Sequence, residues 1–132
     1  MPDSTSNVRF SGADAYIRAA MSGLAARQRT VANNIANVDT PNFKASEVRF
    51  EDTLKTAMSR ARGGVTPNQT GLNAAASRSS LVDATSTRGD GNNVDIDREM
   101  EILSEANLTY SALTQAMSSR IGILRNVISG GR

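Results

Sequence analysis

Apolar residues recur at helical spacing in two stretches near opposite ends of the chain. In the first, over residues 11–38, they alternate at intervals of three and four positions, and only Gln28 interrupts them. This is the a and d spacing by which two helices pack along a narrow stripe. It predicts a helix over 11–38 that Ser11 caps and that ends before Pro41, because proline disfavours helix at the residue before it.

The second stretch, over residues 95–129, repeats the same spacing through five heptads. Polar residues occur in its stripe only at Asn107 and Thr114. Acidic residues gather near its start and arginines near its end, which suits the helix dipole, and two glycines follow it. The pattern predicts one continuous helix over 95–129.

We expect the two stripes to form a seam within one chain. The predicted seam residues are Ile17, Met21, Leu24, Val31 and Ile35 in the first helix, and Ile96, Met100, Leu103, Tyr110, Met117, Ile121, Leu124 and Ile128 in the second. One helix pair covers only the facing stripes, so the other alanine- and leucine-bearing faces favour packing against further subunits. A monomeric helical hairpin is the alternative.

The segment between the two stretches is poor in large apolar residues. Residues 50–58 are compatible with a short amphipathic helix, but 59–93 are rich in Gly, Ser, Thr and Asn. Such a composition buries too little apolar area to offset the entropy of ordering. We expect a long, partly disordered loop or a small, irregular β-containing insertion. The predicted fold is all-α: one domain over 1–132 with paired, coiled-coil-like terminal helices joined by the irregular middle, 39–93.

Composition removes several classes of function. The chain has no Cys and no His, so disulfides, thiolate sites, the usual zinc ligands and a Ser-His-Asp triad are absent from the sequence. Its basic residues are scattered and its aromatic residues few, unlike the basic stripe of a nucleic-acid-binding protein. We expect no enzymatic activity, no cofactor, no metal, and neither nucleic acid nor a small molecule as ligand. The sequence also shows no cleaved secretory signal and no membrane-spanning run.

One partial match to a calcium-binding loop does not change this expectation. Asp90, Asn92 and Glu101 occupy the first, third and twelfth positions of such a loop. The loop requires Gly at its sixth position for a sharp turn, and Asp95 stands there. We therefore predict no calcium site.

Residues 32–45 contain three asparagines within five positions, which a simple helix end does not require. Asn33 and Asn37 lie one turn apart on one face, with Asn34 beside them. Their amides can bond each other or a neighbour's backbone, at a cost in helix propensity. They have no obvious partner in so small a chain, which is compatible with a contact between subunits. From the residues alone, a plain helix end followed by a proline turn is the favoured interpretation.

This stretch resembles the signature of bacterial flagellar rod and hook proteins, A-N-N-[IL]-A-N-x-x-T-P-x-[FY]-K. The matching residues are Ala32, Asn33, Asn34, Ile35, Ala36, Asn37, Thr40, Pro41, Phe43 and Lys44. Asn42 stands where the family often has Gly, and Asn tolerates a left-handed backbone. The segments 50–55 and 91–99 resemble a short proximal rod protein in particular.

The resemblance implies a structural subunit that assembles helically in the proximal rod and transmits torque across the periplasm. Implied partners are further copies, the second proximal rod protein, a small rod-base adaptor protein, the membrane ring and the export gate. It also implies export through the flagellar type III apparatus without a cleaved signal. Subunit contacts are expected at Asn33, Asn34, Asn37, Thr40, Pro41, Phe43 and Lys44. The alternative is a non-catalytic coiled-coil adaptor or an export-associated binding protein.

Overall fold

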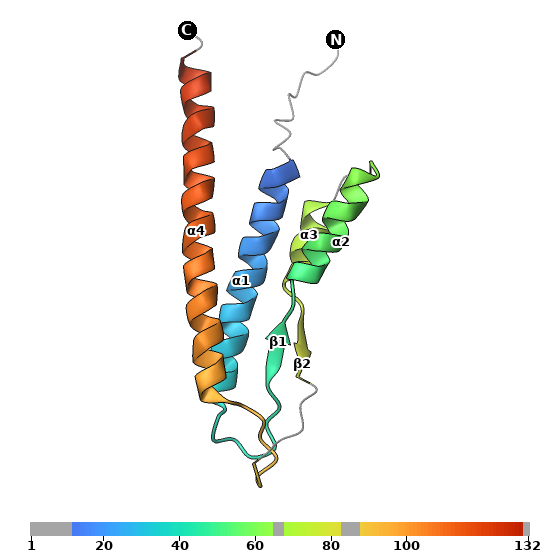
Figure 1. Cartoon of the computed structure of the whole chain (residues 1–132), viewed down its shortest axis with the longest axis vertical. Coiled ribbons are helices and arrows are strands. Elements are labelled where there is room, and N and C mark those ends of the chain that lie inside the picture. The colour runs from blue at the N-terminus through green and yellow to red at the C-terminus, as the bar shows by residue number, and fades with distance from the viewer. Residues whose placement is uncertain (1–11, 65–67, 83–87, 131–132) are drawn as a thin grey trace.

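The computed structural model describes residues 12–64, 68–82 and 88–130. In chain order its elements are α1 (Gly12–Ala36), β1 (Ser46–Val48), α2 (Glu51–Arg62), α3 (Gln69–Ala76), β2 (Ser79–Leu81) and α4 (Ile96–Ser129). Figure 1 shows α1 in the middle, with α4 along one side and α2, α3 and the two strands on the other. The all-α class with long N- and C-terminal helices is confirmed.

α4 follows its predicted bounds closely. Asp95 caps it: one side-chain oxygen accepts the backbone N–H groups of Asp97 at 3.0 Å and Arg98 at 3.3 Å. These bonds satisfy donors that the first turn of a helix leaves unpaired. The helix runs unbroken to Ser129, where Gly130 follows.

α1 is rich in alanine and ends at Ala36, two residues earlier than predicted. Turns follow it, in which the N–H of Thr40 donates to the carbonyl of Asn37 at 3.0 Å and that of Phe43 to Thr40 at 3.2 Å. The predicted cap of this helix, Ser11, lies outside the described residues. None of the described helices is both long and apolar enough to cross a membrane.

Two polar contacts set the register between α1 and α4. The side-chain amide of Gln28 donates to Asn107 Oδ1 at 2.8 Å, and Arg120 Nη1 lies 3.3 Å from Asp14 Oδ1. Because the position on α4 rises as that on α1 falls, the helices are antiparallel. Gln28 and Asn107 each interrupt a predicted apolar stripe, and in the structure they bond each other.

The middle of the chain is more regular than expected. α2 continues past the short helix expected at 50–58, and α3 lies where a loop was expected. Asn68 caps α3, its side chain accepting the N–H of Thr70 at 3.0 Å. Leu72 and Ala76, one turn apart, are buried against α1. α3 was missed because Leu72 is its only large apolar residue and gives no recognisable stripe.

The two strands form a short antiparallel ladder, in which Ser46 lies opposite Leu81 and Val48 opposite Ser79. This agrees with the β-containing alternative for the middle of the chain. Arg27 of α1 also contacts the ladder: its guanidinium donates to the Val48 carbonyl at 2.8 Å. α1 therefore contacts the long helix α4 as well as the short helices and the two strands.

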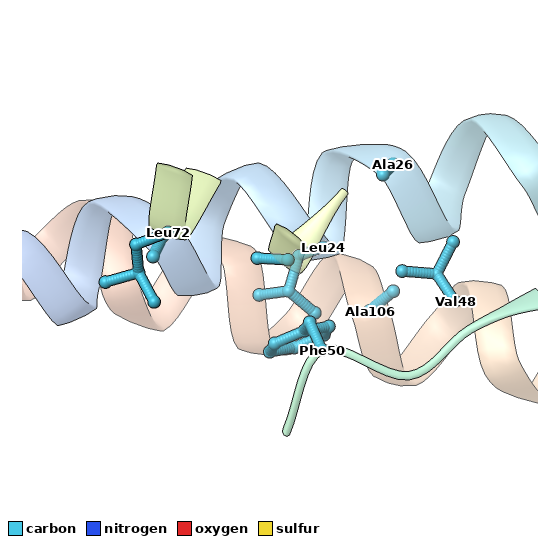
Figure 2. Packing of buried hydrophobic residues seen from close by; sticks show 8 residues of the cluster. Leu24, Ala26, Val48, Phe50, Leu72 and Ala106 are labelled. Atoms are coloured by element: carbon cyan, nitrogen blue, oxygen red, sulfur yellow. The ribbon is translucent and has the colours of Figure 1, made fainter. Parts of the chain in front are cut away.

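The core is small and consists largely of alanine. Its buried members are Ala19, Leu24, Ala26, Val48, Phe50, Leu72, Ala76 and Ala106. Figure 2 shows the Phe50 ring packed beside Leu24. The ring comes this close because Gly23 has no side chain: a Cβ there would lie 2.4 Å from Phe50 Cγ. Alanine buries little area at about 25 cal/mol per Å², so the few large side chains matter most.

We predict that Gly23→Ala lowers the free energy of unfolding by about 1–3 kcal/mol, because the added methyl group displaces Phe50. Urea unfolding followed by far-UV circular dichroism measures this change. The matched control is Gly122→Ala in α4, where nothing lies within 4 Å of an added Cβ. That change should be neutral or stabilise by up to about 1 kcal/mol, since Ala favours helix over Gly. Equal stability of the two variants would contradict the close packing of Phe50 on Gly23.

Candidate functional site

The signature stretch ends in a turn, residues 37–44, that leads from α1 towards β1. The loop over residues 88–94 leads into α4. Figure 1 shows both segments at the same end of the molecule, away from the C-terminal end of α4. We treat the turn and loop 88–94 together as the candidate site.

Asn34, in the last turns of α1, is completely buried. Its side-chain amide donates to the Ser46 carbonyl at 2.8 Å, and its Oδ1 accepts the Ser46 N–H at 3.0 Å. The side chain thus acts as a neighbouring strand would, because it satisfies both backbone groups of one β1 residue. Each such bond contributes about 1 kcal/mol, and leaving a buried partner unsatisfied costs more.

Asn92, in loop 88–94, is also completely buried. Its side-chain N–H₂ donates to the carbonyls of Asn37 at 2.9 Å, Val38 at 3.0 Å and Thr40 at 2.8 Å. Its Oδ1 accepts the N–H of Val94 at 2.8 Å. The Asn92 side chain therefore binds carbonyls in the turn after α1 and also fixes the backbone just before α4.

Further bonds join the end of the turn to the same loop. The Lys44 ammonium group donates to the Gly91 carbonyl at 2.6 Å. The N–H of Ala45 donates to Asn93 Oδ1 at 2.7 Å, and the N–H of Asn93 lies 3.4 Å from the Phe43 carbonyl. The turn is therefore attached to the loop along its length.

The backbone conformation at this contact depends on two residues. Asn42 has a φ of 60°, in the left-handed region that was expected of it, and its N–H donates to the Asp90 carbonyl at 2.8 Å. Gly91 has a φ of 76°, and a Cβ there would lie 2.7 Å from Asn42 Oδ1. Only glycine fits this position without displacing the Asn42 side chain.

Asp90 belongs to the hydrogen-bond network of the loop. Its carboxylate accepts the N–H of Asn92 at 3.0 Å and forms an ion pair with Arg88 at 2.9 Å. The bond from Asn92, aided by the Arg88 charge, holds the pKa of the Asp90 carboxyl below its usual value. Within the described ranges, no three His, Cys, Asp or Glu side chains are grouped as a metal site requires.

The asparagines of the signature have partners within the chain, which corrects the premise that they lack one. The Asn37 amide donates to the Asn33 carbonyl at 2.8 Å and to Asn33 Oδ1 at 3.2 Å, and Thr40 Oγ1 donates to Asn37 Oδ1 at 3.2 Å. With the bonds of Asn34 and Lys44, this gives a large part of the signature a role in folding. That premise overlooked partners that lie close by in the sequence, in the turn itself and in β1, and for Lys44 the distant Gly91.

Several signature side chains nevertheless face solvent. Asn33, Thr40, Pro41 and Lys44 are exposed, and Phe43 is half-buried. The turn therefore combines a bonded interior with an accessible outer surface. A contact with other subunits at this surface stays a prediction.

The seam residues fall into three groups. Leu24 and Val31 are buried; Ile17, Met21, Ile35, Leu103, Tyr110 and Met117 are half-buried; Ile96, Met100, Ile121, Leu124 and Ile128 are exposed. The structure therefore brings α1 and α4 together along their middle. Leu124 and Ile128 lie past Gly12, where α1 begins, so the described part of the chain does not pair them with α1.

Glu99, in the first turn of α4, is a buried acid beside Asn34, near the C-terminal end of α1. Only 6% of its surface is exposed, and its Oε2 has no hydrogen-bond partner among the described residues. Burial raises the pKa of its carboxyl, because a carboxylate loses hydration there, while Asn34 and the Arg98 charge act in the opposite direction. The first turn of α4 thus holds an acid that is poorly solvated in the single chain.

Sequence reasoning missed the role of loop 88–94. In the sequence, Asn92 suggests only part of a calcium loop, and segment 91–99 only a resemblance to a rod protein. The signal was the sequence Gly-Asn-Asn, residues 91–93, just before a capped helix. Nothing local reveals that these amides bind carbonyls some 50 positions away.

We predict that Asn92→Ala destabilises the chain by about 2–4 kcal/mol, because it removes a donor from three turn carbonyls and leaves the N–H of the buried Val94 without its acceptor. Asn92→Asp should cost at least as much, since it keeps the acceptor for Val94 but replaces the donor with a charge. Urea unfolding measures both. Asn126→Ala, at an exposed position on α4, is the control and should change stability by less than about 0.5 kcal/mol. An effect of Asn92→Ala as small as that of the control would contradict the proposed role of this amide.

Comparison with known proteins gives the same picture as the signature. The family model for flagella basal body rod protein matches residues 17–44, which cover most of α1 and the whole turn. The chain is 36% identical over 126 residues to the flagellar basal body rod protein FlgB of Bacillus subtilis (strain 168), covering 93% of this chain and 98% of that protein.

Two further relatives carry the same description. FlgB of Borrelia hermsii is 38% identical over 117 residues, covering 80% of this chain and 87% of that protein. FlgB of Salmonella typhimurium is 34% identical over 134 residues, covering 93% and 97%. The similarity extends over nearly the whole of each chain and includes the segments that form the turn and the loop. This chain therefore belongs to the FlgB family of flagellar basal body rod proteins.

Proposed function

We propose that this chain is a non-catalytic building block of the proximal rod, which assembles helically and transmits torque across the periplasm. A structural role in the basal body rod follows from its family. The proposal adds the position in the rod, the helical assembly and the lack of catalysis. It also adds export through the flagellar type III apparatus without a cleaved signal.

The observation that carries the proposal is how little of α4 is covered in a single chain. Of its 34 residues, only Glu99 and Ala106 are buried. Leu108, Ile123, Val127 and Ile128 are between 62% and 79% exposed. Soluble monomers rarely leave so much apolar surface exposed along one helix, so we expect neighbouring subunits to cover this surface.

The network at the turn favours a role in transmitting force over that of an adaptor. A rod subunit must keep its two long helices in fixed relation while force passes along them. Asn34 and Asn92 join α1, β1 and the approach to α4 through buried hydrogen bonds. The proposed partners are further copies of the chain, the second proximal rod protein, a small rod-base adaptor protein, the membrane ring and the export gate.

The test is genetic. Deleting the gene from its bacterium should abolish swimming and rod assembly, and the wild-type gene should restore both. Phe43→Ala should fail to restore them, because losing an aromatic interface anchor costs about 2 kcal/mol or more. Phe43→Tyr keeps the ring and is the matched control.

Circular dichroism of the purified variants separates assembly from folding. Phe43→Ala should keep the helicity of the wild type. Normal swimming of cells with Phe43→Ala would contradict a subunit contact at this residue. If the deletion strain still built complete rods, the proposed function itself would be wrong.

A further inference from the structure

The C-terminal part of α4 extends beyond α1. Arg120 contacts Asp14, which lies in the first turn of α1, so residues 121–129 continue past that end (Figure 1). We call residues 121–129 the overhang. Its apolar side chains are exposed by 46–79% and comprise Ile121, Ile123, Leu124, Val127 and Ile128. Ile121, Leu124 and Ile128 among them continue the stripe by which α4 packs on α1.

A groove of about 210 Å³ lies in the other half of the molecule, between α1, β1 and the first turns of α4. The half-buried Ile102 and the largely buried Val31 and Val48 form its apolar part, and Glu99 and Glu105 contribute acidic groups. The groove therefore offers the two kinds of surface that an amphipathic, basic helix would contact.

The groove also contains three arginines, and two of them are already paired. Arg27 forms an ion pair with Glu51 at 2.7 Å, and Arg49 forms one with Glu47. On the α4 side, Arg98 stands beside the two acids Glu99 and Glu105. The lining as a whole carries three acidic residues and three arginines, but its α4 side carries two acidic residues and one arginine.

Charge is separated along α4 itself. Residues 96–105 contain four acidic residues and one Arg, whereas residues 106–129 contain two Arg and no acidic residue. The acidic part borders the groove, and Arg125 lies within the overhang. Because one helix carries both complementary surfaces at opposite ends, a second copy of the chain is the occupant that matches the groove.

We propose that the overhang of one copy docks in the groove of a second copy, head to tail, with Arg125 near Glu105. The inference rests on the proposed function and names the surfaces by which copies meet. A contact between two different surfaces of the same chain does not close on itself, and so it generates a helical array. When the overhang docks, its exposed apolar residues become covered. Arg125 then brings positive charge towards the poorly solvated Glu99.

The test uses the absence of native cysteine, which removes background cross-linking. A chain with Thr30→Cys and Val127→Cys, one position in the groove and one in the overhang, replaces the wild type in cells. A short bis-maleimide is then added to isolated basal bodies. The register places these two positions about 35 Å apart within one chain, at 1.5 Å per residue, so they cannot be bridged internally.

We expect a ladder of covalent dimers, trimers and longer oligomers from the double variant and none from either single variant. Ile102→Cys with Leu124→Cys provides a second pair, should the first impair assembly. The matched control combines Val127→Cys with Ser111→Cys, an exposed position on a different face of α4, and should give no ladder. Arg125→Glu should weaken the ladder about two- to fivefold, and Glu105→Arg in the same chain should restore it.

The outcomes separate this inference from the proposed function. If swimming cells contain normal rods but neither cysteine pair yields a ladder, the head-to-tail contact is wrong and the rod function stands. Dimers from Val127→Cys alone would indicate a symmetric contact, and cross-links only to other rod proteins would indicate a different occupant; either result overturns the inference. Absence of the wild-type chain from basal bodies would instead contradict the proposed function.

Discussion

The fold depends on one side-chain amide, that of Asn92, which donates to three backbone carbonyls in the turn after α1. These carbonyls lie just beyond the last turn of α1, in a turn whose outer surface stays exposed to solvent. Asn92 comes just before α4, so the bonds that hold the turn after α1 also place the start of α4. The two long helices therefore begin their antiparallel packing from a common point.

Away from that point the helices are held by a narrow stripe. Gln28 bonds Asn107 and Arg120 approaches Asp14, so polar pairs rather than apolar bulk fix the register. Alanine forms much of the core, which lets elements approach closely but buries little area. The consequence is a chain that is anchored firmly at the turn and leaves the far half of α4 largely exposed, which suits a subunit completed by its neighbours.

The two long helices could be predicted because heptad spacing is a local property of the sequence. Gln28 and Asn107 were recognisable as breaks in two stripes, but their pairing depends on a register that neither stripe specifies. α3 could not be predicted, since its alanines have meaning only against α1. The signature predicted the family, yet it did not predict that Asn34 serves β1 or that Asn92 serves the turn, because both contacts join segments that are separate in the sequence.

Amide hydrogen exchange of the dilute, purified chain shows whether the turn end anchors the fold while neighbours are needed to cover the far half of α4. We expect strong protection in α1 from Leu24 to Asn34 and in α4 from Glu99 to Leu113. We expect rapid exchange over residues 121–129, which becomes slow in assembled rods. Equal protection along the whole of α4 in the dilute chain, or fast exchange around Asn34 and Asn92, would contradict an anchor at the turn.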